Sequence, residues 1–209
     1  MNWRERYIRT IFIGQIDALE SVGIDRILAG FSTAEAEALE VANDAFARMG
    51  GEPSDGGDAD MADIAEIAND EGLAHYEMLK SVEQAIINLL AAAMYHLYEQ
   101  QKAHLVRILR RTGGPVIDFD DQPGKTKIDE ANLVANATKH GGNAQDLKKI
   151  RPDLFAPPGI ASVGSAPTSN AAAKLTEPLG GQSLFVQIQD IRDYAAAIRQ
   201  RWQAVAQLV

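Results

Sequence analysis

The sequence contains no cysteine, few aromatic residues and no long apolar run. The absence of cysteine among the 209 residues excludes disulfides, zinc–thiolate sites, iron–sulfur clusters and a cysteine nucleophile. Aromatic residues make up only 6% of the chain while alanine is abundant, which favours helices over a β-sandwich. The longest apolar stretch, residues 85–97, is too short to cross a bilayer, and the N-terminus lacks the apolar core of a secretory signal. We therefore expect a cytoplasmic protein with no membrane partner.

Motifs for nucleotide and metal chemistry are also missing. The chain has no Walker-type loop, no glycine-rich dinucleotide turn, no GxSxG and no HExxH sequence. The histidines are not paired four residues apart, and no Glu-x-x-His pair supports a carboxylate metal centre. The sequence thus predicts neither a metal nor an organic cofactor.

Acidic residues outnumber basic ones, but the excess is local. The chain has 20 Lys and Arg against 29 Asp and Glu, a formal net charge of −9. Residues 29–75 hold twelve acids and one base, or 1 − 12 = −11, whereas residues 100–151 hold ten bases and six acids, or 10 − 6 = +4. The overall charge argues against a protein that coats nucleic acid, but the basic region is compatible with a local contact to phosphate.

Apolar residues at helical spacing predict two helices in the first 50 residues. The first covers residues 3–28 and is expected to break near Gly23. The second begins with a capping-box pattern at residues 32–35 and ends at Gly50. An acidic, glycine-rich loop follows at residues 50–59. The apolar face of the second helix is expected to comprise Leu39, Ala42, Phe46 and Met49.

A long central helix is predicted over residues 60–112, which contain no proline and a single glycine, Gly72. We expect this helix to start or kink near Gly72. Residues 73–111 alone would span about 60 Å, so a helix there must break, protrude or meet a partner. Its apolar face is expected at Leu79, Val82, Ile86, Leu90, Ala93, Leu97, Leu105 and Ile108.

The rest of the chain predicts two short helices, over residues 128–140 and 143–150, and a final helix that Asp190 caps. Residues 184–188 have the composition of a short strand. The final helix has one apolar face, expected in the core: Ile191, Tyr194, Ile198, Trp202 and Val205. We expect a single domain over residues 1–209: N-terminal helices in 1–50, the loop in 50–59, a core in 60–155, an irregular segment in 156–183 and the C-terminal helix in 184–209.

The strongest candidate site lies at the end of the predicted helix over residues 128–140. On a helix Asn132, Asn136 and His140 share one face, and Lys139 lies alongside. The negative end of the helix dipole favours the protonated form of a histidine at a helix C-terminus, which suits a general acid or a phosphate contact. The alternative is that His140 and Lys139 only cap the last carbonyls of their helix.

This segment and the long helix before it resemble the HEPN superfamily (higher eukaryotes and prokaryotes nucleotide-binding). The resemblance covers mainly residues 73–155, including the pattern Lys148-Lys-Ile-Arg151-Pro-Asp-Leu-Phe155, and more loosely the last helix. It implies an all-α, HEPN-like bundle with a long central helix pair, which forms a homodimer or joins a complex. It also implies metal-independent RNA cleavage in toxin–antitoxin and phage-defence systems.

The resemblance assigns roles to individual residues. The superfamily motif is an arginine, a polar residue directly after it and a histidine four to six residues after the arginine. Asn136 and His140 match the last two positions and would be catalytic together with Lys139, whereas Ala135 stands where the arginine would hold the phosphate. The missing cation would come from Arg110 or Arg111 at the end of the long helix. The residues expected to contact RNA or phosphate are Arg110, Arg111, Lys148 and Lys149. We expect either a ribonuclease or a catalytically silent module.

Two polar residues of the long helix and one charged segment leave alternatives open. Glu99 is placed to orient His140, or else it belongs to a solvated network with Lys102 and His104. Gln101 falls on the apolar face, where it either satisfies a buried partner or faces a site. The acidic residues 35–71 support a second function, a non-enzymatic adaptor, antitoxin or inhibitor subunit that binds a basic partner.

Overall fold

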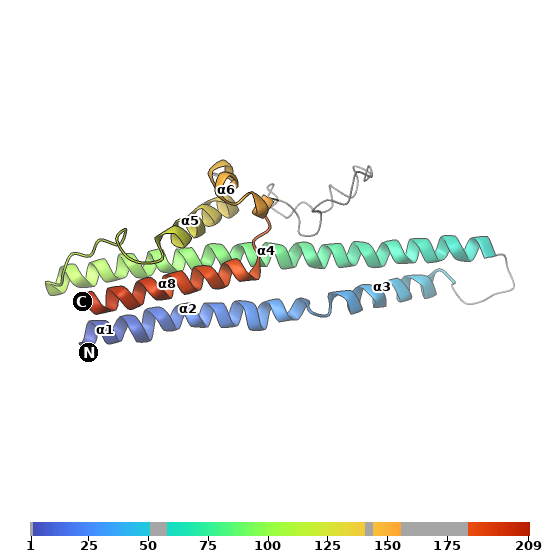
Figure 1. Cartoon of the computed structure of the whole chain (residues 1–209). Coiled ribbons are helices and arrows are strands. Elements are labelled where there is room, and N and C mark those ends of the chain that lie inside the picture. Colours follow the sequence, from blue (N-terminus) through green and yellow to red (C-terminus); the bar gives the residue numbers. More distant parts are fainter. Residues whose placement is uncertain (1, 51–57, 141–143, 156–183) are drawn as a thin grey trace.

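The computed structural model describes residues 2–50, 58–140, 144–155 and 184–209, and these residues form an all-α fold (Figure 1). This confirms the predicted fold class. The irregular segment predicted over 156–183 and most of the acidic loop predicted over 50–59 lie outside the described residues.

The longest element is α4 (Asp58–Thr112), a single helix of 55 residues. At 1.5 Å per residue it is about 82 Å long. The predicted start or kink at Gly72 is wrong, because the helix runs through this residue. A Cβ atom at Gly72 would lie 2.7 Å from the carbonyl oxygen of Ala38 in α3 (Ala34–Arg48). The glycine therefore lets α3 pack closely along the first part of α4.

The N-terminal helix is continuous over residues 3–31, although two of its stretches are π-helical. The break expected near Gly23 is wrong. Gly23 is buried, and a Cβ atom there would meet the side chain of Leu90 at 2.7 Å, so this glycine also serves a close approach between helices. The segments in order are α1 (Trp3–Tyr7), η1 (Ile8–Phe12), α2 (Ile13–Glu20), η2 (Ser21–Ile27) and η3 (Leu28–Phe31).

Helix α3 begins and ends close to the predicted residues, but its details differ. No capping box forms: the Thr33 hydroxyl donates to the Glu37 carboxylate at 2.6 Å instead of capping a backbone amide. Leu39, expected in the core, is 63% exposed, whereas Ala34 and Ala45 are buried. The helix ends as predicted before Gly50, which has a φ of +83°.

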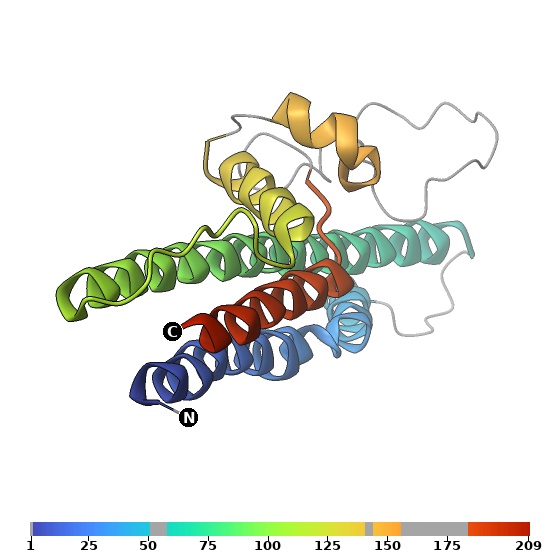
Figure 2. The ribbon, with the colours of Figure 1, turned by 60° about the vertical axis from the view of Figure 1, so that its left-hand side comes forward.

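The bundle is built around α4. Helix α8 (Ile188–Leu208) lies between α4 and the N-terminal helix, and α5 (Lys125–His140) lies on another side of α4 (Figures 1 and 2). Helix α6 (Ala144–Ile150) and a 3₁₀ turn, η4 (Pro152–Phe155), follow α5. Because α8 covers only one half of α4, the α3–α4 hairpin projects beyond the bundle (Figure 1).

The predicted face of α8 is confirmed, since all five of its residues are buried. Trp202 at its centre donates from Nε1 to Oε1 of Gln101 at 2.7 Å, and Gln101 donates in turn to the carbonyl of Phe12 at 3.0 Å. Gln101 is therefore a buried residue whose polar atoms are satisfied, which is the first of the two predicted alternatives.

The buried face of α4 lies on a different side of the helix from the predicted face. It comprises Ile87, Ala91, Met94, Tyr98, Leu105 and Leu109. Of the predicted residues only Leu105 is buried, and Val82 is exposed. Other helices pack on several sides of α4. More of its residues are therefore partly buried than in a helix that buries a single apolar stripe.

Residues 184–187 are extended but do not form the predicted strand. The backbone amide of Phe185 donates to the Leu154 carbonyl at 2.7 Å, and the Asn88 side chain donates to the Leu184 carbonyl at 2.7 Å. Gln187 is the N-cap of α8, and Asp190 accepts the Gln187 amide at 2.9 Å from the third helical position. The prediction that Asp190 is the capping residue is therefore wrong in detail, because Gln187 is the N-cap and Asp190 completes its capping box from within the helix.

Arg151 joins α5, η4 and α8 through an ionic cluster. Its guanidinium binds Glu130 of α5, Asp190 of α8 at 2.9 Å and Asp153 at 2.7 Å. The hydrogen bonds from Arg151 lower the pKa of Asp153. Glu130 also accepts a hydrogen bond from the hydroxyl of Tyr194 at 2.9 Å. The Arg-Pro-Asp-Leu-Phe part of the sequence pattern therefore has a structural role here.

Candidate functional site

Two residues of the polar face predicted on α5, Asn132 and Asn136, are joined by a hydrogen bond. Asn136 donates from Nδ2 to Oδ1 of Asn132 at 2.9 Å, and both side chains are half-buried. Lys139 is exposed near the end of the helix. The side chain of His140 lies outside the described part of the structure, so its role as a catalytic residue or as a cap stays a prediction.

Ala135 occupies a position that has no space for a longer side chain. Its exposed fraction is 0%. An arginine at this position would have to bury its charge or displace packed neighbours, both of which are costly. The fold thus has a buried alanine where the resemblance implies a phosphate-binding arginine.

The other basic candidates are not brought together as one patch. Arg110 and Arg111 lie in the last turn of α4, at one end of the molecule, whereas α5 lies over the middle of α4 (Figures 1 and 2). In α6, Lys149 pairs with Asp146 at 2.7 Å, and the ammonium of Lys148 lies 5.9 Å from the ring centre of Phe155. Among these residues the lysines of α6 already have partners, and the arginines are distant from α5.

Glu99 forms contacts within its own helix. Its carboxylate accepts from the Tyr95 hydroxyl at 3.1 Å and lies 3.2 Å from Nδ1 of His96. The predicted network with Lys102 and His104 is not formed, because Lys102 lies over the ring of Phe119 and His104 pairs with Tyr7 at 3.2 Å. Burial and the Glu99 carboxylate both raise the pKa of Tyr95. Whether Glu99 orients His140 stays a prediction.

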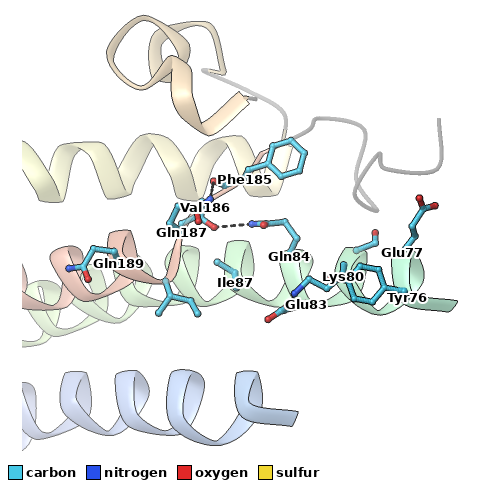
Figure 3. Close-up of a pocket in the computed structure, with 12 residues that line it drawn as sticks. Tyr76, Glu77, Lys80, Glu83, Gln84, Ile87, Phe185, Val186, Gln187 and Gln189 are labelled. Carbon is cyan, nitrogen blue, oxygen red and sulfur yellow. Dashed lines mark hydrogen bonds and ion pairs between the residues drawn. The ribbon is translucent and has the colours of Figure 1, made fainter. Parts of the chain in front are cut away.

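An apolar cavity that the sequence did not indicate lies at the N-terminal end of α8. It has a volume of about 570 Å³ and lies between α4 and residues 185–189 (Figure 3). Tyr76, Lys80, Gln84 and Ile87 line it from α4, opposite Phe185 and Ile188. We call this cavity the α8-end groove. A second hollow of about 440 Å³, between α3 and α4, is also lined by Tyr76, so the two hollows meet at this residue.

Several polar side chains of the α8-end groove, those of Gln84, Lys80 and Glu83 among them, already have intramolecular partners. Gln84 donates to the carbonyl of Val186 at 2.9 Å, and Lys80 pairs with Glu83. The hydrogen bond between Lys80 and Glu83 raises the pKa of Lys80. An enzyme site or a site for a polar ligand needs convergent polar groups that are available. The described residues of the groove instead offer apolar walls with an acidic rim.

The acidic rim belongs to the projecting hairpin. Glu77 and Glu83 line the α8-end groove, and Glu35 lines the second hollow beside the exposed Leu39 and Leu73. The hairpin helices carry the remaining acids of the −11 segment that the structure describes with side chains: Glu37, Glu40, Asp44, Asp63, Glu66, Asp70 and Glu71.

The fold and the groove define an all-α bundle with a projecting, acidic helical hairpin. No described helix has an apolar stretch long enough to span a membrane, and the described residues contain no cluster of three or more potential metal ligands. No protein-family model, curated protein or solved structure matches the chain.

Proposed function

We propose that the chain is a non-enzymatic interaction subunit, of the adaptor, antitoxin or inhibitor kind, that binds a basic amphipathic helix of a partner protein in the α8-end groove. The single observation that carries this proposal is an apolar groove on α4, directly beyond the first turn of α8, with carboxylates on its rim.

The shape of the groove fits a helix. Helix α8 packs along one half of α4, and the groove lies where the same face of α4 continues past Ile188, the first residue of α8 (Figure 3). A partner helix can continue the line of α8 and place its apolar side chains against Tyr76, Ile87 and Phe185. Such helix-in-groove binding uses apolar residues spaced three or four positions apart.

The charge around the groove selects a basic partner. Glu77 stands on the rim together with Glu83, which is already paired with Lys80, and Glu35 stands at the adjoining hollow. Acidic rims attract Lys and Arg on the solvent side of a docked helix and repel acidic helices and nucleic acid. The local acidity is therefore better suited to a basic protein segment than to RNA.

The test uses a fluorescein-labelled Leu/Lys amphipathic peptide of about 18 residues, or five helical turns. Fluorescence anisotropy is expected to show saturable binding of this peptide and none of a Leu/Glu peptide with the same apolar face. Tyr76→Arg places a cation in the groove and should weaken binding at least about tenfold. Leu208→Arg, an exposed position at the other end of α8, is the matched control and should bind as the unchanged chain does.

Two results would contradict the proposal. Equal binding by the Tyr76 and Leu208 variants would show that the peptide is held only by general acidity. Binding that appears only after deletion of residues 156–183 would show that the chain itself occupies the groove. Circular dichroism of each variant verifies that the helical content is unchanged.

A further inference from the structure

Helix α4 has an exposed apolar stripe that no other described helix covers. Ile67, Met78, Val82 and Leu89 are 51%, 51%, 37% and 60% exposed. Together with Ala74 and Ala85 they follow one another at steps of seven, four, four, three and four residues, so they lie on one face. A stripe with this spacing is the pattern of a helix that pairs with another helix.

This stripe is separate from the α8-end groove. Met78 and Leu89 come two residues after Tyr76 and Ile87, which places them about 160° around the helix from the groove. A partner on the stripe and a partner in the groove therefore contact opposite sides of α4, and neither inference depends on the other.

The charges of α4 are divided between its ends. Residues 58–77 contain seven Asp and Glu and no Lys or Arg, whereas residues 100–112 contain four Lys and Arg and no Asp or Glu. The midpoint between Asp58 and Thr112 is residue 85, which is Ala85 on the stripe. When such a helix meets a parallel copy, like charges face each other, and when it meets an antiparallel copy, opposite charges do.

We propose that a second copy of this chain covers the stripe, with the two α4 helices antiparallel and a twofold axis at Ala85. Residue i then faces residue 170 − i of the partner subunit. Asp63 lies opposite an arginine, the position of Arg107, and Ile67 lies opposite the small Ala103. Arg107 and Ala103 are exposed, so these two positions towards the C-terminal end of α4 are open to the partner as well.

Because the chain lacks cysteine, single introduced cysteines report the register. Ala85→Cys lies on the axis and should form a disulfide with its copy under copper phenanthroline and air, visible as a dimer band without reductant. Ala103→Cys should not cross-link with itself, but should do so with Ile67→Cys when the two variants are mixed. Self-linking of Ala103→Cys with equal efficiency would indicate a parallel pair and overturn the proposal.

Sedimentation equilibrium tests the interface without cysteines. The unchanged chain is expected at twice its mass of 22.6 kDa, and Val82→Glu with Leu89→Glu should weaken the dimer at least about 100-fold. Val116→Glu changes a fully exposed valine outside the stripe and should leave the dimer intact. A monomeric unchanged chain at 100 μM, or a Val82/Leu89 variant that stays dimeric, would overturn the proposal.

A charge exchange tests the orientation separately. Asp63→Lys should weaken the dimer roughly tenfold at low salt, because it faces Arg107 in two symmetric places, and Arg107→Glu in the same chain should restore it. A parallel pair does not place these residues together. Failure of the second change to restore the dimer would therefore overturn the antiparallel register.

Discussion

Arg151→Ala is expected to be among the most destabilising substitutions in the chain. The arginine is the shared cation for Glu130 and Asp190, whose side chains are only 8% and 9% exposed. Alanine leaves Asp190 buried without a positive charge, and leaves Glu130 with only the partly exposed Lys127 as a cation. Their remaining donors, the Tyr194 hydroxyl and Lys127 for Glu130 and the Gln187 amide for Asp190, do not replace it.

The expected loss follows from the burial of these groups. Removing one partner of a buried ion pair costs about 3–5 kcal/mol, because the other partner stays buried and unpaired. The Arg151 side chain is itself 19% exposed, so water can reach part of the cluster, and the lower end of the range applies. A loss of about 3 kcal/mol corresponds to a fall in Tm of roughly 6–12 °C for a chain of this size.

Urea unfolding followed by circular dichroism measures this loss. Arg192→Ala removes an exposed arginine from the same helix as Asp190 and should change the unfolding free energy by less than about 0.5 kcal/mol. Adding Glu130→Gln and Asp190→Asn to Arg151→Ala removes the unpaired charges and should recover part of the stability. A single variant within about 1 kcal/mol of the unchanged chain, or a triple variant less stable than the single one, would refute this reasoning.

Three further predictions follow from individual contacts. Gly72→Ala should speed amide exchange in α3, because the new Cβ meets a backbone oxygen at 2.7 Å. Gly14→Ala, whose new Cβ has nothing within 4 Å, should instead stabilise the chain by up to about 1 kcal/mol. Equal amide exchange in the two variants would contradict this reasoning. Because its folded pKa is lowered, Asp153 contributes stability above pH ~4 and loses it as the pH falls through the folded value, so the stability difference from Asp153→Asn should vanish in acid. That difference should not exceed about 1 kcal/mol, since the side chain is 60% exposed, and a difference that persists at low pH would contradict the assignment. Asn136→Ala with His140→Ala should leave the binding of labelled RNA unchanged if the chain is an interaction subunit, and a clear loss would favour the RNA hypothesis instead.

Local periodicity was enough to predict the helices and the face of α8. Apolar residues three and four positions apart indicate which side of a helix is buried when one neighbour covers it, and Trp202 and Tyr194 lie on such a side. The Asn132–Asn136 pair was predictable for the same reason, since residues four apart on a helix touch whatever the fold is.

Contacts between distant segments could not be predicted in this way. Gly72 and Gly23 look like helix breaks in a single sequence, because a glycine has no side chain to show what approaches it. In the fold each lets another helix pack against α4. The buried side of α4 was predicted wrongly for a related reason. Ala91 and Tyr98 are not strongly apolar residues, although several helices meet on their side of α4.

The α8-end groove is the part of the candidate site that had no sequence signal. Its walls come from Tyr76 and Phe185, which are more than 100 residues apart in the chain. Each residue by itself is of a type that is ordinary in a protein core. The groove exists because α8 begins at Ile188 and does not cover the face of α4 beyond that residue. The acidic segment was visible in the sequence, but its nearness to an apolar groove was not.

The length of α4 connects these observations. A helix of about 82 Å extends well past the half that α8 covers, and α3 protects only one side of the remainder. Helices in proteins gain most of their stability from an apolar face that packs against other elements. The projecting half of α4 still exposes Ile67, Met78 and Val82 on one side and the groove on another. Two unfilled faces on one projecting helix are best explained if the chain works in an assembly, with a copy of itself on the stripe and a basic helix in the groove.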